Sequence, residues 1–186
     1  MNKIQYVAAV GISILLMGCP ARSVFPLFTE NDIVYNPGLI GTWIDHKNGD
    51  TFSFQKSGEK SYEVVLHEQM GKGRVNREAY TVQLGQIDKF WFIDSYPSKK
   101  NGGGHHAVSA HILSRIWIDR DTLRMASLES DWLRAMIDAD KIHIAHVRRD
   151  DDIILTATTE ELRAFVVRFA EDDKAFPNPG VLVRSK

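Results

Sequence analysis

Residues 51–67, TFSFQKSGEKSYEVVLH, decide the fold class of this chain. Apolar side chains occupy every second position on either side of a polar stretch: Phe52 and Phe54, then Tyr62, Val64 and Leu66. A period of two places alternate side chains on one face of a β-strand. The polar residues between the two runs, KSGE, have the composition of a turn. The segment therefore predicts a β-hairpin with one face in a core.

The same alternation extends on both sides of this hairpin. The predicted strands are Leu39–Ile44, Thr51–Gln55, Ser61–His67, Glu78–Leu84, Phe90–Ser95, Ala107–Ile118 and Thr122–Ser127. Turn-forming residues separate them, so consecutive strands are expected to pair as an antiparallel meander. In Phe90–Ile93 both faces are apolar, which predicts a central strand whose second face is covered by a helix or an arm.

Two helices are predicted in the C-terminal half of the chain. Ser130 is expected to cap the first, and Thr158 with Glu161 has capping-box spacing at the start of the second. Between the helices, Ile142–Val147 and Ile153–Thr156 are expected to pair as strands. The predicted fold class is mainly β with α (α+β), built as an open sheet or as a closed barrel.

The N-terminus carries a leader-like segment that ends at the chain's single cysteine, Cys19. Lys3 is followed by an uncharged stretch whose apolar run, Val7–Met17, is shorter than the roughly 20 residues that span a bilayer. This length is typical of a signal-peptide core. Residues 1–18 are therefore predicted to be a cleaved signal peptide; an uncleaved, buried helix with an inert cysteine is the alternative.

Leu16, Gly18 and Cys19, with Met17 at the variable position, resemble the lipobox of bacterial lipoproteins. The resemblance implies cleavage between Gly18 and Cys19, and acyl chains such as palmitate on Cys19. Two or more chains hold a protein stably on a membrane. Since Pro20 rather than Asp follows the cysteine, the resemblance also implies the outer membrane, with the protein facing the periplasm.

Composition narrows the remaining possibilities. Removal of residues 1–18 leaves 22 basic and 24 acidic residues, so nucleic acid is not an expected partner. We expect residues 19–37 to form a tether and packed arm, and residues 38–186 to form a single globular β-rich domain. With no second cysteine, its apolar core has to provide the stability.

Gly41-Thr42-Trp43 resembles the Gly-x-Trp signature of lipocalins, and the chain also resembles uncharacterised envelope lipoproteins of similar size. The lipocalin resemblance implies a barrel that Trp43 plugs at one end and a small apolar ligand enters at the other. Two helices and a strand pair exceed the single late helix of lipocalins, so a half-covered open sheet remains the alternative. The predicted ligand pocket comprises Trp43, Phe52, Phe54, Trp91, His111 and Ile112.

The histidines suggest no ready-made metal site. His143 and His146 are expected to point to opposite faces of a strand, and His105 and His106 fall in a glycine-rich loop. His111 is a candidate buried base, but the sequence has no Gly-x-Ser-x-Gly or His-Glu-x-x-His motif. We therefore assign no catalytic residue, metal or cofactor, and enzymatic activity is not favoured.

Three classes of function remain. The first is a lipid-anchored binding or accessory module for a small apolar ligand or an envelope partner. The second is a hydrolase-type enzyme that uses His111 with an acidic partner. The third is a structural or assembly protein of the cell envelope, which would display a large exposed apolar patch.

Overall fold

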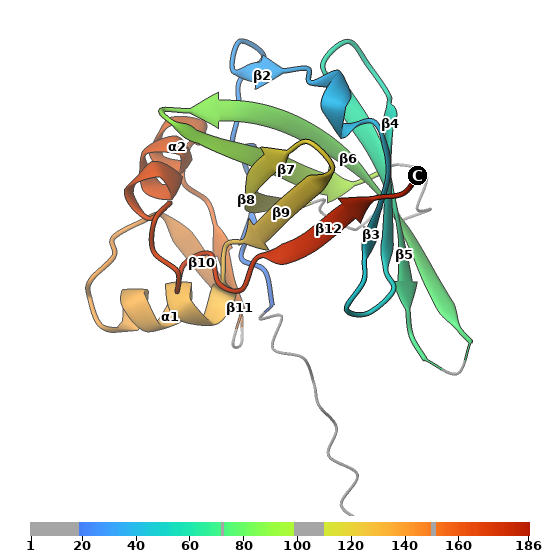
Figure 1. Cartoon of the computed structure of the whole chain (residues 1–186). Helices are drawn as coiled ribbons and strands as arrows, with labels where there is room; N and C mark the ends of the chain where they lie inside the picture. The colour runs from blue at the N-terminus through green and yellow to red at the C-terminus, as the bar shows by residue number, and fades with distance from the viewer. Residues whose placement is uncertain (1–18, 72, 99–109, 150–151) are drawn as a thin grey trace, which may run out of the picture.

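The computed structural model describes residues 19–71, 73–98, 110–149 and 152–186 (Figure 1). The strands within these ranges are β1 (Arg22–Ser23), β2 (Ile33–Val34), β3 (Gly41–Asp45), β4 (Thr51–Lys56), β5 (Ser61–Gln69), β6 (Val75–Ile87), β7 (Phe90–Pro97), β8 (His111–Asp119), β9 (Thr122–Ser127), β10 (His146–Arg149), β11 (Asp152–Leu155) and β12 (Gly180–Arg184). The helices are the 3-10 turn η1 (Pro37–Leu39), α1 (Ser130–Asp138) and α2 (Thr159–Arg168).

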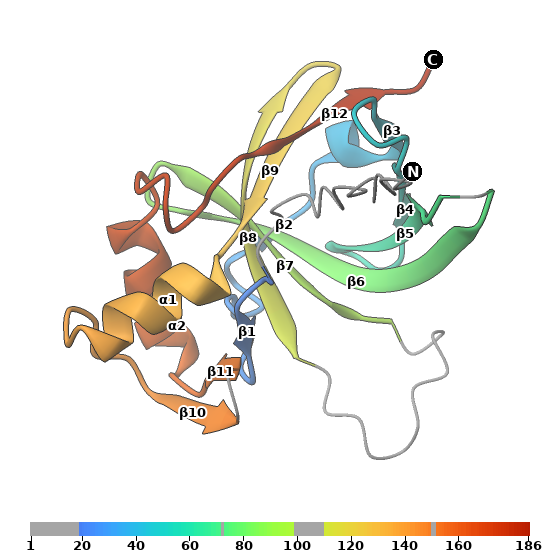
Figure 2. The same cartoon turned by 90° about the horizontal axis from the view of Figure 1, so that it is seen from below.

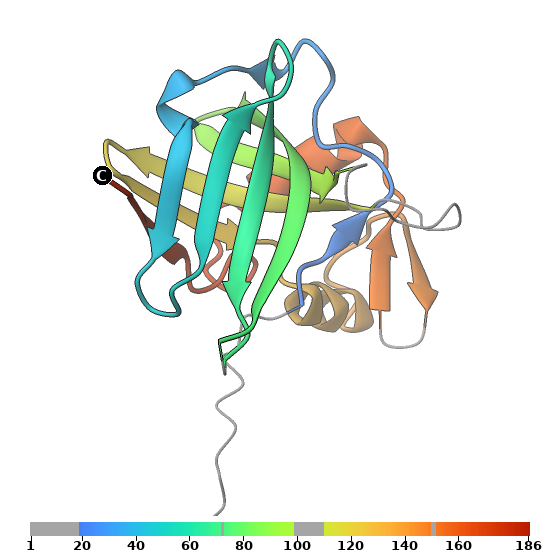
Figure 3. The same ribbon diagram turned by 90° about the vertical axis from the view of Figure 1, so that its right-hand side faces the viewer.

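Eight of these strands close into an antiparallel barrel. Each strand from β3 to β9 pairs with the next one in sequence, and β12 pairs with both β9 and β3. Figure 3 shows one wall of this barrel, from β3 in blue to β6 in green. Closure leaves the barrel strands without the free edges of an open sheet. The predicted meander and α+β class are confirmed, and the meander is closed.

Among the eight barrel strands, the closing strand β12 is the one that the alternation pattern did not predict. β12 has only five residues and follows Pro177 and Pro179. Its register places Leu182 opposite both Asp45 of β3 and Leu123 of β9. Only Leu182 of β12 is buried, and the strand is defined by its two distant partners, which local periodicity does not report.

The sheet continues beyond the barrel through β8. One edge of β8 pairs with β7, and its other edge is divided between β9 and β1. Ser114–Asp119 of β8 pairs with β9, whereas His111 and Ile112 pair with β1. β1 then runs parallel to β11, and β11 pairs with β10. This extension lies beside the barrel, next to the two helices (Figure 2).

Several predicted boundaries were wrong. β10 begins at His146 rather than Ile142, because Ile142 instead packs into the core beneath the helices. Glu129 rather than Ser130 caps α1, and its carboxylate accepts from the Asp131 N–H at 3.2 Å. The capping box of α2 is confirmed by reciprocal bonds between Thr158 and Glu161. Positions 107–109 of a predicted strand lie outside the described residues.

Two apolar cores lie on opposite faces of the barrel wall. The inner cluster comprises Leu39, Trp43, Phe54, Tyr62, Val64, Val82, Leu84, Ile93, Ile116, Leu123 and Leu182. In the outer cluster, Phe90 and Phe92 of β7 meet Leu133 of α1 and Phe165 of α2. The prediction that β7 is apolar on both faces because a helix or arm covers it is therefore confirmed.

The arm that precedes the barrel is held on the outer wall by a close contact at Gly85. Phe28 is buried, and its ring lies where a Cβ on Gly85 would be, 2.4 Å from Cε1. Gly85 pairs with Ile33 of β2, so the missing side chain lets the arm follow β6 closely. This packing explains a glycine in the middle of a long strand.

We predict that Gly85→Ala lowers the free energy of unfolding by about 1–3 kcal/mol, because the added methyl group overlaps the buried Phe28 ring. Urea denaturation measures the change. Gly180→Ala is the matched control: it adds a methyl group to another strand glycine, where the nearest atom lies at 3.8 Å. Equal effects of the two substitutions would contradict this account of the arm.

Candidate functional site

One end of the barrel is closed around Trp43. Its ring is fully buried, and Nε1 donates to the Leu39 carbonyl of η1 at 2.9 Å. The Arg184 guanidinium lies 4.2 Å from the ring centroid, and its Nη1 donates to the Ile40 carbonyl at 2.7 Å. Arg184 also donates to the Gly38 carbonyl. η1 is thereby fixed across this end by the last barrel strand.

Gly41 has a specific role in this closure. Its φ is +129°, and a Cβ at this position would lie 2.8 Å from Nη1 of Arg184. The glycine therefore permits both the backbone turn into β3 and the approach of the guanidinium. Gly41 and Trp43, the two fixed positions of the Gly-x-Trp pattern, are therefore the two residues that the Arg184 guanidinium approaches most closely in β3.

Tyr62 completes the closed end. Its hydroxyl accepts from the Asn36 N–H at 2.7 Å and donates to the Asn36 carbonyl at 3.1 Å. The ring stacks on Tyr35 with centroids 5.4 Å apart. Burial raises the pKa of Tyr62, which keeps its hydroxyl protonated as a donor. The chain segment before β3 is thus fastened to β5.

The opposite end of the barrel carries polar residues on its inward face. Val82 and Leu84 belong to the inner cluster, so alternation places Tyr80, Glu78 and Asn76 of β6 on the same face. Asn76 Nδ2 donates to Glu78 at 3.1 Å and more weakly, at 3.4 Å, to Glu68 of β5. Tyr80 donates its hydroxyl to Glu78.

This network has an electrostatic consequence. Burial is the largest cause that raises the pKa of Tyr80, followed by its hydrogen bond to Glu78 and the charges of Glu78 and Glu68. The phenol is therefore held as a neutral donor beside two carboxylates. On the inward face of β5 and β6, apolar side chains therefore give way to acidic, hydrogen-bonding ones toward the β5–β6 turn.

Sequence reasoning did not identify these four polar residues. The available signal was the period of two: positions 76, 78 and 80 continue the register of Val82 and Leu84. The prediction began that strand at Glu78, whereas β6 begins at Val75. Along β6, every second residue changes from polar at positions 76–80 to apolar at positions 82 and 84. This change along one strand is the signal that predicts an inward face with a polar end and an apolar end.

The residues of the predicted pocket divide between the two faces of the wall. Trp43 and Phe54 belong to the inner cluster, and Phe52 and Trp91 pack against it, partly buried. Ile112 is half-buried and shares the inward face of β8 with Ile116. Four of these residues belong to one cluster or pack against it, and Ile112 shares only their inward face. His111 lies on the opposite, outer face.

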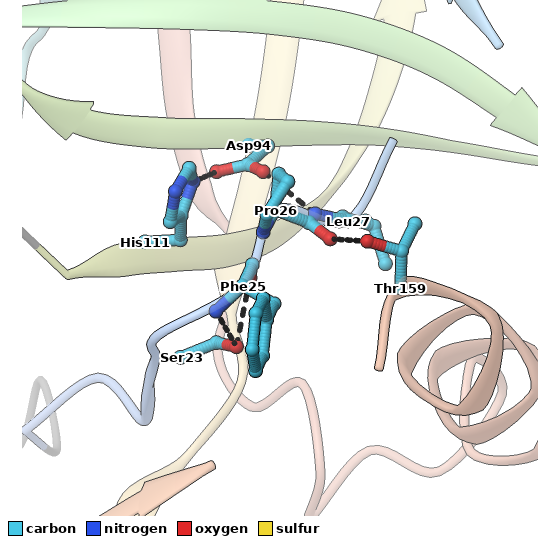
Figure 4. Close-up of polar contacts among 7 residues, drawn as sticks. All are labelled: Ser23, Phe25, Pro26, Leu27, Asp94, His111 and Thr159. Atoms are coloured by element: carbon cyan, nitrogen blue, oxygen red, sulfur yellow. Dashed lines mark hydrogen bonds and ion pairs between the residues drawn. The ribbon is translucent and has the colours of Figure 1, made fainter. Parts of the chain in front are cut away.

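His111 forms a buried joint instead (Figure 4). Its Nδ1 lies 2.7 Å from Oδ1 of Asp94, a fully buried residue of β7. The other oxygen, Oδ2, accepts from the Leu27 N–H of the arm at 2.8 Å. The preceding carbonyl, that of Pro26, accepts from the Thr159 hydroxyl at 2.7 Å. The Asp94 carboxylate thus connects β7, β8 and the arm, and the arm in turn connects to α2.

Ser23 lies next to this joint but does not extend it toward His111. Ser23 pairs with His111 across β1 and β8, so the two side chains start from adjacent positions. The Ser23 hydroxyl donates to the Phe25 carbonyl at 2.8 Å and accepts from the Phe25 N–H at 3.2 Å. In Figure 4 its oxygen points toward Phe25 rather than toward the imidazole. The arrangement is that of a turn, not of a serine nucleophile with its base.

A separate surface groove of about 700 Å³ lies between α1, α2 and the segment before β10. Ile137, Ile144 and Phe165 form its apolar part, and both His143 and His146 line it. The prediction that these histidines point to opposite faces of one strand does not apply, because His143 precedes β10. His146 donates from Nδ1 to the Ile144 carbonyl at 2.8 Å. His105 and His106 lie outside the described residues.

Cys19, the predicted lipid-attachment residue, is exposed at the start of the described chain. Its carbonyl accepts from the Ser130 N–H at the start of α1 at 3.1 Å. The Ala21 N–H donates to the Leu128 carbonyl at 2.7 Å, and Pro20 forms a β-bridge with Glu129. The chain is therefore bound to the domain from Cys19 onward, while Leu16, Met17 and Gly18 lie outside the described residues.

Comparisons of the chain with protein-family models, with curated proteins and with solved structures gave no significant match. Within the described ranges, no helix is both long enough and apolar enough to cross a membrane.

We predict that Asp94→Ala lowers the free energy of unfolding by about 2–3 kcal/mol, because it leaves the buried Leu27 N–H without its acceptor. Asp94→Asn, which keeps an acceptor oxygen, is expected to cost less. Asp138→Ala, which removes an exposed partner of Arg148, is expected to change stability by less than about 1 kcal/mol. Similar losses for Asp94→Ala and Asp138→Ala in urea denaturation would contradict the proposed joint.

Proposed function

We propose that this protein is a lipid-anchored domain of the bacterial cell envelope whose barrel binds a small, predominantly apolar ligand. The observation that carries the proposal is the asymmetry of the barrel interior: one end is closed around Trp43 and Arg184, and the other end bears half-buried apolar and polar side chains. Pockets for small ligands combine apolar walls with a few oriented polar groups. The lipobox-like leader and the exposed Cys19 support the anchor.

The two ends of the interior suggest how such a ligand lies. The inward face offers apolar contact through the half-buried side chains of Phe52, Leu66 and Ile112. The carboxylates of Glu68 and Glu78 lie farther toward the β5–β6 turn. A ligand with an apolar body and a hydrogen-bond-donating or cationic polar group matches this order. Its apolar part would lie toward Trp43 and its polar part near Tyr80.

A hydrolase is the second candidate, because His111 has the acidic partner that this function requires. Asp94 orients the imidazole at 2.7 Å. Both Asp94 oxygens have partners, however, and the adjacent Ser23 hydroxyl is bonded to Phe25. A catalytic dyad requires a nucleophile within reach of its base. The contacts of Asp94 and His111 instead favour a structural joint, so the binding function is preferred.

An assembly role would be supported by a large apolar patch. Among the described residues, the exposed large apolar side chains are Val24, Phe25, Met70, Val75, Val147 and Val181. They are distributed over four parts of the chain, namely the segment after β1, the β5–β6 turn, β10 and β12, and we therefore do not adopt an assembly role as the primary function.

We predict that the barrel of the delipidated protein binds an apolar fluorophore, N-phenyl-1-naphthylamine. Two substitutions of Ile112, one by a charged and one by a larger side chain, are each expected to weaken this binding at least tenfold. Ile112→Glu places a charge on the inward face, and Ile112→Trp fills space there. Gln55→Glu, which adds a charge to an exposed outward position of β4, should bind like the wild type. Circular dichroism checks the fold of each variant, and equal binding by all four proteins would count against the pocket.

We predict that Cys19→Ala abolishes incorporation of radiolabelled palmitate and shifts the protein from the membrane fraction to the soluble fraction. Native mass spectrometry of the detergent-extracted wild type should show the acyl mass and any co-purifying small molecule. Unchanged palmitate incorporation in Cys19→Ala would reject Cys19 as the anchor. Ser23→Ala, a nearby hydroxyl change, is the control and should keep both label and location.

A further inference from the structure

The proposed anchor is attached to the domain without a flexible linker. Hydrogen bonds from Ser130 to the Cys19 carbonyl, and from Ala21 to the Leu128 carbonyl, fix the first described residues against the junction of β9 and α1. Farther along, the Val24 N–H donates to the Leu155 carbonyl at 2.9 Å. A lipidated cysteine in this position leaves little slack between the bilayer and the fold. The place of Cys19 on the domain therefore sets which face meets the membrane.

This attachment lies toward the acidic end of the barrel. β3 begins at the closed end with Gly41 next to Arg184, and it ends at Asp45. Because neighbouring barrel strands are antiparallel, β9 runs in the same direction as β3. Ser127, the last residue of β9, therefore lies at the end away from Arg184. Figures 1 and 3 agree: α1 and the β3–β4 and β5–β6 turns lie at the bottom, and η1 and the β4–β5 turn lie at the top.

Two large apolar side chains next to the β5–β6 turn, at this end of the barrel, are exposed to solvent. Met70 and Val75 are 53% and 50% exposed, and Arg74 between them is also exposed. Gly71 and Gly73 both have φ of +72°, a backbone conformation that glycine adopts without strain. Apolar side chains with a neighbouring cation are suited to the boundary between acyl chains and anionic headgroups.

The charged side chains near the turn also fit an anionic membrane surface. The adjacent β3–β4 loop exposes Lys47, whereas Glu68 and Glu78 face the interior. Nearer to Cys19, Asp131 is exposed but paired with Arg134 at 2.6 Å. At the rim formed by β5 and β6, Arg74 is therefore exposed, and the carboxylates of Glu68 and Glu78 face the interior.

We infer that the acidic end of the barrel is held against the surface of an anionic bilayer, with Met70, Arg74 and Val75 seated among the lipid headgroups. This inference rests on the proposed anchor at Cys19 and on the proposed barrel site. It identifies the ligand class as a membrane-derived amphiphile, since such a molecule would pass from the bilayer into the barrel along the shortest route. The closed end, with η1 and Arg184, faces away from the membrane.

Single-cysteine probes test this orientation. Acylation occupies the native thiol, so Val75→Cys and Glu59→Cys each provide one labelling position, at opposite ends of the barrel. Both variants of the acylated protein are labelled with a nitrobenzoxadiazole thiol reagent in vesicles of phosphatidylethanolamine and phosphatidylglycerol. Quenching is measured with headgroup spin-labelled lipid. We expect quenching at position 75 to exceed that at position 59 at least threefold.

A ten-residue Gly-Ser insertion after Pro20 provides the control for the short attachment. It keeps the acylated cysteine and is expected to reduce the difference between the two positions toward equality. A difference that stays at full size would overturn the role of the short attachment.

Two outcomes separate this inference from the proposed function. An acylated protein quenched equally at both positions, or more strongly at position 59, would reject the orientation and leave the anchor intact. Absence of the acyl mass from intact protein would reject the anchor, and the orientation would fall with it. Fluorophore binding by the delipidated protein tests the pocket independently of both.

Discussion

The insertion of β12 between β3 and β9 is the constraint on which the rest of the structure depends. It supplies the hydrogen bonds that turn a meander into a closed wall, and it brings Arg184 over Trp43. The bond from Arg184 to the Ile40 carbonyl joins residues 144 positions apart. Without this strand, β3 and β9 would each expose an edge, and η1 would lose the guanidinium that fixes it. The closed end of the interior therefore depends on a five-residue segment.

The outer wall shows how a barrel carries a second core without a second domain. β7 contributes alternately to both sides, with Ile93 inward and Phe90 and Phe92 outward. The one fully buried carboxylate described on that strand, Asp94, is satisfied by Leu27 and His111. A buried carboxylate with two partners fixes the position of the arm more specifically than apolar contact does. This geometry explains why a histidine on a central strand is compatible with a non-catalytic role.

Local sequence patterns predicted much of the fold but little of its long-range assembly. Alternation located the barrel strands from β3 to β9, and the Thr158–Glu161 spacing located α2. β12, β1 and β2 were not predicted, because each is stabilised by partners distant in sequence. Five of the six pocket residues share the inward face, but His111 does not. The acidic partner of His111 lies 17 positions away on the neighbouring strand, a relation that depends on strand register.

The position of β12 also constrains the order in which the chain becomes a barrel. The seven strands from β3 to β9 can pair with their sequence neighbours as they emerge, whereas β12 follows two helices and a strand pair. Until residues 180–184 arrive, β3 and β9 remain unpaired along the sides that will meet β12. Such edges promote aggregation, and a chain exported in an unfolded state would expose them only after translocation. A chaperone that shields β3 or β9 would therefore matter most just before the C-terminal segment docks.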